Sequence, residues 1–168
     1  MLLQTENMTT LPFSFVELNF DDSDHQTALF NLMNAYMLDR MGCEKPLHAD
    51  SFQELVCGLQ KQANYIGVLV QNENEYIALA NCFVNFSTFK MSSLINIHDL
   101  IVLPDYRGKG VGRFLMKSVK AIARKIDCCK ITLEVRNDNQ TAQNLYLSEG
   151  FKECNPPMYF WEATIDRA

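Results

Sequence analysis

The segment Leu100–Leu115, LIVLPDYRGKGVGRFL, constrains the fold of this chain more than any other. It predicts an apolar strand, a short turn with glycines at alternate positions, and an amphipathic helix that begins near Val111. Gly108, Gly110 and Gly112 carry no Cβ, so the chain can bend tightly and bring backbone N–H groups close to a ligand. The helix N-terminus adds unpaired donors and the positive end of its dipole. These features together indicate a phosphate-binding site.

Formal positive charge is interleaved with the glycines, on Arg107, Lys109 and Arg113. A nucleotide P-loop requires Lys followed by Ser or Thr after its last glycine, whereas Gly112 is followed by Arg113 and an aromatic residue. A dinucleotide-binding G-x-G-x-x-G pattern requires a third glycine, and the two available frames place Arg113 or Leu115 there. Neither nucleotide pattern fits this segment.

Two motifs resemble those of the GCN5-related N-acetyltransferases, the GNAT family. Arg107–Gly112 (RGKGVG) is similar to the family's Q/R-x-x-G-x-G/A segment, and Leu133–Phe151 is similar to its L-x-V, N-x-x-A-x-x-L-Y and G-F motif. The two motifs occur in the family's order and cover roughly the C-terminal half of the chain. The resemblance implies an α/β fold with a mixed, mostly antiparallel sheet of six or seven strands flanked by about four helices.

The resemblance also implies a function, namely transfer of an acetyl group from acetyl-CoA to a primary amine by direct attack in a ternary complex. The amine acceptor belongs to a small molecule or a protein, and the sequence does not choose between them. In the family, the strand that ends here at Val102 splays from its neighbour and exposes backbone groups to the pantetheine arm. The implied acetyl-CoA contacts are Leu100, Ile101, Val102, Arg107, Gly108, Lys109, Gly110, Val111, Gly112, Arg113, Asn139 and Tyr146. The alternative function is a non-catalytic acyl-CoA-binding module.

Four residues are candidates for proton transfer. Tyr146 matches the tyrosine that serves as general acid toward the departing thiolate, although a helix residue packed in the core would show the same pattern. Glu134 matches a catalytic glutamate of the ribosomal-protein alanine acetyltransferase branch, and burial between apolar strand residues would raise its pKa. His98 and Asp99 are rival bases. The glutamate of the histone-acetylating branch is replaced by Asn96, and a base made of ordered water stays open.

Composition sets the organisation of the chain. A hydrophobic content of 48% in 168 residues suits one domain, which we expect over residues 11–168 after a flexible tail at 1–10. No segment predicts a signal peptide or a membrane span, so we expect a cytoplasmic protein without membrane contact. The net charge of -5 argues against nucleic acid as the main partner. Acidic residues predominate in 1–100 and basic ones in 101–168, which suits a polyanionic cofactor beside a cationic acceptor.

The six cysteines and three histidines show no metal-ligand spacing, so we expect no metal. We interpret the cysteines as reduced and mostly buried thiols. The oligomeric state stays open, with a homodimer among the alternatives.

Hydrophobic periodicity predicts the order β-α-α-β-β-β-α-β-α-β-β, with helices on both faces of the sheet. The expected strands are 13–18, 65–70, 76–84, 94–103, 131–135, 151–154 and 158–163. The expected helices begin near Asp22, Asp50, Val111 and Asn139. We expect acceptor specificity from 36–48 and 83–91. The candidate groups there are Asp39 and Glu44 for an ammonium, and Phe86 and Phe89 for an apolar wall.

Overall fold

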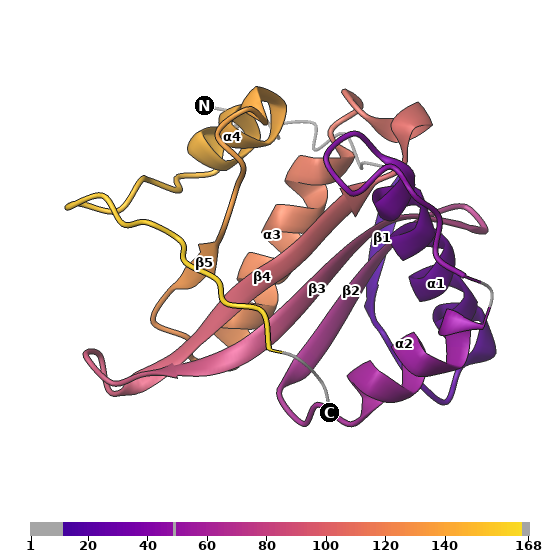
Figure 1. Cartoon of the computed structure of the whole chain (residues 1–168), viewed down its shortest axis with the longest axis horizontal. Helices are drawn as coiled ribbons and strands as arrows, with labels where there is room; N and C mark the ends of the chain where they lie inside the picture. Colours follow the sequence, from indigo (N-terminus) through magenta and orange to yellow (C-terminus); the bar gives the residue numbers. More distant parts are fainter. Residues whose placement is uncertain (1–11, 49, 166–168) are drawn as a thin grey trace, which may run out of the picture.

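A computed structural model describes residues 12–48 and 50–165 and follows the expected order of elements as far as the fourth helix (Figure 1). The expected N-terminal tail lies outside the described residues. The elements are β1 (Phe13–Glu17), α1 (Ser23–Leu38), α2 (Ser51–Gln60), β2 (Tyr65–Asn72), β3 (Glu75–Ser87), β4 (Ser92–Val102), the 3-10 turn η1 (Pro104–Tyr106), α3 (Val111–Lys125), β5 (Ile131–Leu133) and α4 (Gln140–Ser148).

The strands form one sheet in the order β1-β2-β3-β4-β5. Neighbouring strands are antiparallel except for β4 and β5, which run parallel from Ile95 opposite Ile131 to Ile97 opposite Leu133. The mixed, mostly antiparallel sheet and its helices therefore confirm the expected fold class. Five strands are found in the described residues, where six or seven were expected.

The missing strands are those expected at 151–154 and 158–163, and these two expectations are wrong for this structure. Residues 151–165 contain no helix or strand, and most of them are exposed. An apolar alternation becomes a strand only when a neighbouring strand accepts its hydrogen bonds, and this segment pairs with no described strand. Pro156 and Pro157 also lack the N–H donors that a ladder requires.

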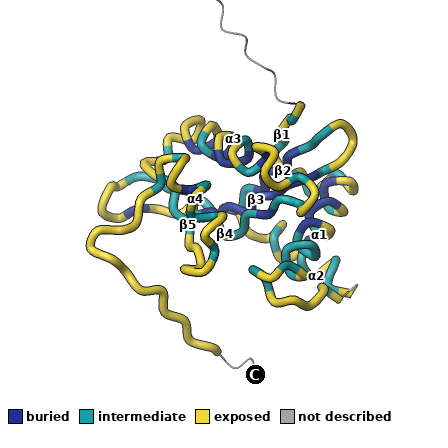
Figure 2. The backbone as a smooth tube through the Cα atoms, turned by 90° about the horizontal axis from the view of Figure 1, so that it is seen from above, coloured by how far each residue is buried: buried dark blue, intermediate teal, exposed yellow. Residues whose placement is uncertain are grey.

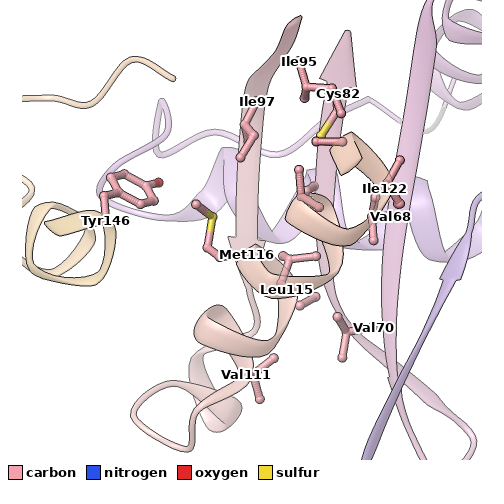
Figure 3. Packing of buried hydrophobic residues seen from close by; sticks show 14 of the residues in the cluster. Val68, Val70, Cys82, Ile95, Ile97, Val111, Leu115, Met116, Ile122 and Tyr146 are labelled. Carbon is pink, nitrogen blue, oxygen red and sulfur yellow. The ribbon is translucent and has the colours of Figure 1, made fainter. Parts of the chain in front are cut away.

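Helices cover both faces of the sheet, as the sequence predicts (Figures 1 and 2). On one face, α3 packs Leu115 and Ile122 against side chains such as Val68 and Val70 (Figure 3). On the other face, α1 and α2 pack against Leu69, Leu79 and Ile101. The two clusters use alternate residues of the same strands, because successive strand side chains point to opposite faces.

The cysteines are mostly exposed, so the expectation of mostly buried thiols is wrong. Only Cys82 is buried among the six, all of which are free, and it lies in the middle of β3. Cys43, Cys57, Cys129 and Cys154 are exposed because they lie in loops or on the outer side of a helix. The adjacent pair at 128 and 129 precedes β5 and belongs to no strand.

Asp22 begins α1 as its N-cap and shows how the sequence sets a helix start. Its carboxylate accepts hydrogen bonds from the backbone N–H groups of Asp24 (2.8 Å) and His25 (3.2 Å). These bonds stabilise the ionised form and lower the pKa of Asp22.

None of the helices in the described ranges is long and apolar enough to cross a membrane.

Candidate active site

The site is built around the end of β4, where the strand loses one neighbour. β5 pairs with β4 only as far as Ile97 and Leu133, whereas β3 accompanies β4 to Val102. Leu100, Ile101 and Val102 therefore have a neighbouring strand on one side only. The expected splay would leave the same backbone groups without a neighbour, and it stays a prediction.

The turn after β4 brings the glycines to the start of α3. Gly108 (φ +73°) and Gly110 (φ +85°) adopt left-handed conformations that other residues rarely take. Gly110 is the N-cap of α3 and no side chain caps this helix, so the first N–H groups depend on other partners. Gly112 serves a different purpose, because a Cβ there would lie 3.0 Å from Leu145 Cδ2 and so hold α4 away.

A cleft of about 630 Å³ lies between the end of β4, the turn, the end of α1 and the start of α4. We call it the glycine cleft. Nine of the expected acetyl-CoA contacts line it: Leu100, Ile101, Val102, Arg107, Gly108, Gly110, Gly112, Arg113 and Asn139. Two others do not. The Lys109 ammonium lies 5.6 Å from the centre of the Tyr106 ring, and Val111 is buried in the core.

The end of α1 and the residues after it also line this cleft, through Tyr36, Asp39, Arg40 and Met41. The helix break at 36–48 predicts a role in acceptor specificity, and nothing in the sequence indicates that it lies beside the glycines. The only sequence signal was the break of the helix after Leu38. Thr141, Ala142 and Leu145 of α4 also line the cleft, and none of them was expected from the sequence to do so. The α1 contribution depends on tertiary packing, which no local pattern reveals.

Arg107 is already paired in this structure. Its guanidinium donates a hydrogen bond to Asp39 Oδ2 at 2.8 Å, and its Nε donates to the Val102 carbonyl at 2.9 Å. Asp39 also accepts a hydrogen bond from the Met41 N–H at 2.8 Å. That bond and then Arg107 lower the pKa of Asp39 against the opposing effect of burial. Asp39 was expected to attract the ammonium group of an acceptor, and in this structure its carboxylate is instead paired with Arg107.

A second ion-pair cluster fixes α3 to the end of α4. Glu149 is nearly buried, and it pairs with Arg113 at 3.2 Å and with Lys120 at 3.1 Å. No local sequence pattern predicts this cluster, because its members are brought together only by the packing of α3 against α4. Arg113 therefore lines the glycine cleft from a fixed position.

A smaller cavity of about 140 Å³ adjoins the glycine cleft and shares Tyr36, Met41, Leu100, Asn139 and Ala142 with it. We call it the tyrosine pocket. Tyr146, Glu134 and His98 line it.

The fourth candidate, Asp99, lines neither cavity. Its carboxylate accepts a hydrogen bond from Asn81 Nδ2 at 2.9 Å. Glu44, Phe86 and Phe89 also line neither cavity, and all three are exposed, so these three expected acceptor groups are not assembled here.

Tyr146 is 9% exposed and extends from α4 toward Ile97 and Met116 (Figure 3). Burial, and secondarily the nearby Tyr36, raises the pKa of Tyr146 to about 12. The phenol is therefore protonated throughout the neutral range. Its ring packs 6.0 Å from that of Phe151, so the residue belongs both to the core and to the pocket.

Glu134 departs from expectation. Strand β5 ends at Leu133, one residue earlier, so the carboxylate is exposed instead of buried among strand residues. Asn96 on β4 donates from Nδ2 to both carboxylate oxygens at 3.3 Å. Asn96, which replaces the glutamate of the histone-acetylating branch, thus holds Glu134 beside the pocket.

Asn139 is the N-cap of α4, as one of its two expected roles requires. Its side-chain oxygen accepts a hydrogen bond from the Ala142 N–H at 3.1 Å. The same residue lines both cavities, so the cap also fixes a polar group at their junction.

Comparisons with known proteins show the fold and the family of this chain. Curated relatives include the uncharacterized N-acetyltransferase YhfO of Bacillus subtilis, which is 31% identical over 87 residues, or 51% of this chain and 58% of YhfO. An aminoglycoside N(6')-acetyltransferase type 1 of Acinetobacter genomosp. 13 is 24% identical over 131 residues, or 74% of this chain and 90% of the relative. The match to YhfO thus spans little more than half of that relative.

Solved structures share the fold at low sequence identity. A probable acetyltransferase has a TM-score of 0.78 at 18% identity, with 92% of this chain and 99% of that chain covered. AAC(6')-Iy in complex with a bisubstrate CoA analogue has a TM-score of 0.71 at 14% identity, with coverages of 90% and 99%. The model of the acetyltransferase (GNAT) family matches residues 28–151. This chain is a member of the GNAT acetyltransferase family.

Proposed function

We propose that this protein transfers an acetyl group from acetyl-CoA to a primary amine by direct attack in a ternary complex. The observation that carries the proposal is the glycine cleft, in which the one-sided end of β4 meets the uncapped N-terminus of α3. The cleft continues into the tyrosine pocket, so a donor and an acceptor have adjoining places.

The donor is held mainly by backbone groups. The edge of Leu100–Val102 that lacks a strand neighbour offers N–H and C=O groups to the amide-bearing pantetheine arm. The left-handed Gly108 and Gly110 let the start of α3 present N–H groups and its positive dipole end to the pyrophosphate. Arg113 and Arg40 add positive charge to the lining.

In the transfer, a C–N bond forms to the amine nitrogen while the thioester C–S bond breaks. The amine loses a proton and the thiolate gains one. Tyr146 is the acid, because its raised pKa keeps the phenol protonated beside the junction of the cavities. Glu134 and His98, which line the same pocket, are the candidate bases, and ordered water is the third.

The acceptor is a small molecule or a protein amine. Several relatives are named for small amines, including an aminoglycoside and streptothricin. These names support small cationic amines as the first acceptors to test.

The test separates binding from catalysis. Calorimetry with acetyl-CoA, with NAD as the comparison ligand, measures donor binding. Release of free thiol, followed over a panel of amines, measures transfer. Binding of acetyl-CoA together with amine-dependent thiol release supports the enzyme. Binding without release by any amine indicates the alternative, a non-catalytic acyl-CoA-binding module. No binding of acetyl-CoA would overturn both.

A further inference from the structure

The tyrosine pocket is lined by charges of both signs. Its lining contains one carboxylate, that of Glu134, and one guanidinium, that of Arg136, two residues further along the chain. An acceptor with positive charge alone would be attracted by the first group and repelled by the second. An acceptor with one charge of each sign would find a partner for both. The lining therefore favours an amine that carries an anionic group close by.

Arg136 already binds a carboxylate in this structure, that of Asp138. Its Nε donates a hydrogen bond to Asp138 Oδ1 and its Nη2 donates one to Asp138 Oδ2, both at 2.9 Å. The two parallel bonds match the planar guanidinium to the planar carboxylate. Both side chains are about half exposed, and an ion pair in contact with water contributes little to stability. The carboxylate of a ligand can therefore replace that of Asp138 on Arg136.

The backbone that carries Arg136 is fixed by the start of α4. Gln143 donates from Nε2 to the carbonyl oxygens of Arg136 at 2.9 Å and Asn137 at 3.0 Å. The Asn139 N–H also donates to the Arg136 carbonyl, at 3.1 Å. Burial and then two nearby aspartates raise the pKa of Tyr36, whereas Arg136 lowers it. The charge of Arg136 thus acts on a phenol that lines both cavities.

The size of the tyrosine pocket limits what can enter it. Its volume of about 140 Å³ is well below the roughly 300–1,000 Å³ of sites that hold a drug-sized ligand. Apolar side chains complete the lining, among them Met41, Ile97, Leu100 and Leu133. The pocket therefore suits a small molecule with one aliphatic side chain, in preference to one with several rings and amines.

We propose that the acceptor is a free amino acid with an aliphatic side chain, whose carboxylate replaces that of Asp138 on Arg136 while its amine lies beside Glu134. The inference rests on the proposed acetyl transfer and narrows its acceptor to one class. The ammonium loses two protons in all as the C–N bond forms and the thioester C–S bond breaks. One proton passes to the thiolate and the other, through the base, to solvent. The products are an N-acetyl amino acid and CoA.

Matched acceptors isolate the contribution of the carboxylate. We would measure thiol release with leucine and methionine, each beside its carboxamide, which keeps the amine and the side chain and lacks the negative charge. The carboxylate preference is kcat/KM for the amino acid divided by kcat/KM for its carboxamide. Comparing this preference between protein variants cancels the different basicities of the two amines.

Three variants test the preference. Arg136→Gln should lower it by at least tenfold, mainly through a higher KM for the amino acid, because hydrogen bonds to a charged group are lost. Asp138→Asn should raise it by about two- to fivefold, because the competing carboxylate is removed. Arg124→Gln, at an exposed arginine of α3 that lines neither cavity, is the control and should keep it. Thermal melts check that the variants fold.

Three results would overturn the proposal while leaving the acetyl transfer intact. The first is an equal preference in Arg136→Gln and in the wild type. The second is a lower preference in Asp138→Asn, which would contradict the exchange of carboxylates. The third is turnover of the carboxamides without turnover of either amino acid, which would indicate the N-terminal amine of a peptide as the acceptor.

Calorimetry separates the failure of this inference from the failure of the proposed function. Leucine is titrated into the protein saturated with CoA, so that binding is measured without turnover. Binding that Arg136→Gln weakens by at least tenfold, with no transfer to any amine, would support the carboxylate site and overturn the proposed function. No binding of leucine or methionine, together with acetylation of other amines, would overturn the carboxylate site alone.

Discussion

Arg107 and Asp39 form an ion pair with 2.8 Å between the guanidinium nitrogen and the carboxylate oxygen, across 68 residues of sequence. The pair joins the turn after β4 to the end of α1. It also places a carboxylate in the lining of a cleft that we assign to an anion. Asp39 therefore competes with a phosphate for Arg107, and the strength of that competition is measurable.

We expect Asp39→Asn to tighten the binding of acetyl-CoA by about two- to fivefold, which corresponds to an exposed ion pair worth roughly 0.5–1 kcal/mol. Asparagine keeps an oxygen for the Met41 N–H while the competing charge is lost. Calorimetry at low ionic strength measures the effect. Asp138→Asn is the matched control, because Asp138 pairs with Arg136 at 2.9 Å outside the glycine cleft. Weaker binding by Asp39→Asn would show that the pair assists the ligand.

The glycines of the turn should respond differently to substitution. Gly110→Val forces a β-branched residue to φ +85°, which costs about 1–3 kcal/mol or displaces the turn. We expect at least tenfold weaker acetyl-CoA binding in calorimetry, with α3 retained by circular dichroism. Gly58→Ala in α2, where a Cβ meets no atom within 4 Å, is the control and should preserve affinity. Unchanged affinity in Gly110→Val would remove the turn from the site.

Tyr146→Phe should lower kcat by at least tenfold and leave the acetyl-CoA dissociation constant nearly unchanged, because only the proton donor is lost. The pKa of about 12 predicts that Tyr146 does not limit the rate of the wild-type protein below about pH 11. A kcat that is equal in the two proteins across the pH range would exclude the acid role.

The same pKa has a consequence for stability. Folding raises the pKa of Tyr146 above its ordinary value of 10.0, so the folded state resists ionisation of the phenol. Its contribution is complete below pH 10 and is lost as the pH rises to 12. The loss amounts to about 3 kcal/mol for a shift of two units. Urea unfolding at pH 8 and pH 11.5 should show a smaller loss for Tyr146→Phe than for the wild type. Equal losses of stability in the two proteins would show that the Tyr146 phenol is exposed to water in the folded state.

Glu134→Gln tests the candidate base. We expect a reduced kcat with acetyl-CoA affinity preserved, because the carboxylate that would accept the amine proton is lost. Asn96→Ala removes the hydrogen bonds that hold the carboxylate and should lower kcat by a smaller factor. Glu153→Gln, on the exposed C-terminal segment, is the control. An unchanged kcat in Glu134→Gln would leave His98 or water as the base.

Local sequence predicts much of this fold, and the reasons are visible in single residues. Asp22 and Asn139 have side chains that cap helices, and both were expected to do so. The spacing of the glycines after β4 predicts the turn. The structure shows why glycine is needed there, because two of the three occupy left-handed conformations. The wrong expectations concern partners distant in sequence. The final strands have no described neighbour, and Glu134 lies beyond the end of a short β5.

The site was predictable on the donor side and less so on the acceptor side. The donor cleft is assembled from adjacent residues of one strand–turn–helix unit, which a linear motif encodes. The lining from α1 and the partners of Arg107, Arg113 and Glu134 depend on packing between distant elements. Side chains such as Tyr36 and Asp39 carry no local signal of the cavity that they enter.

The most direct test of the central claim is mass spectrometry of an amine after incubation with acetyl-CoA and the protein, with free thiol measured in parallel. The account predicts an acetylated amine and released CoA in equal amounts, both reduced together in Tyr146→Phe. Binding of acetyl-CoA with no acetylated product from any amine in the panel would contradict it.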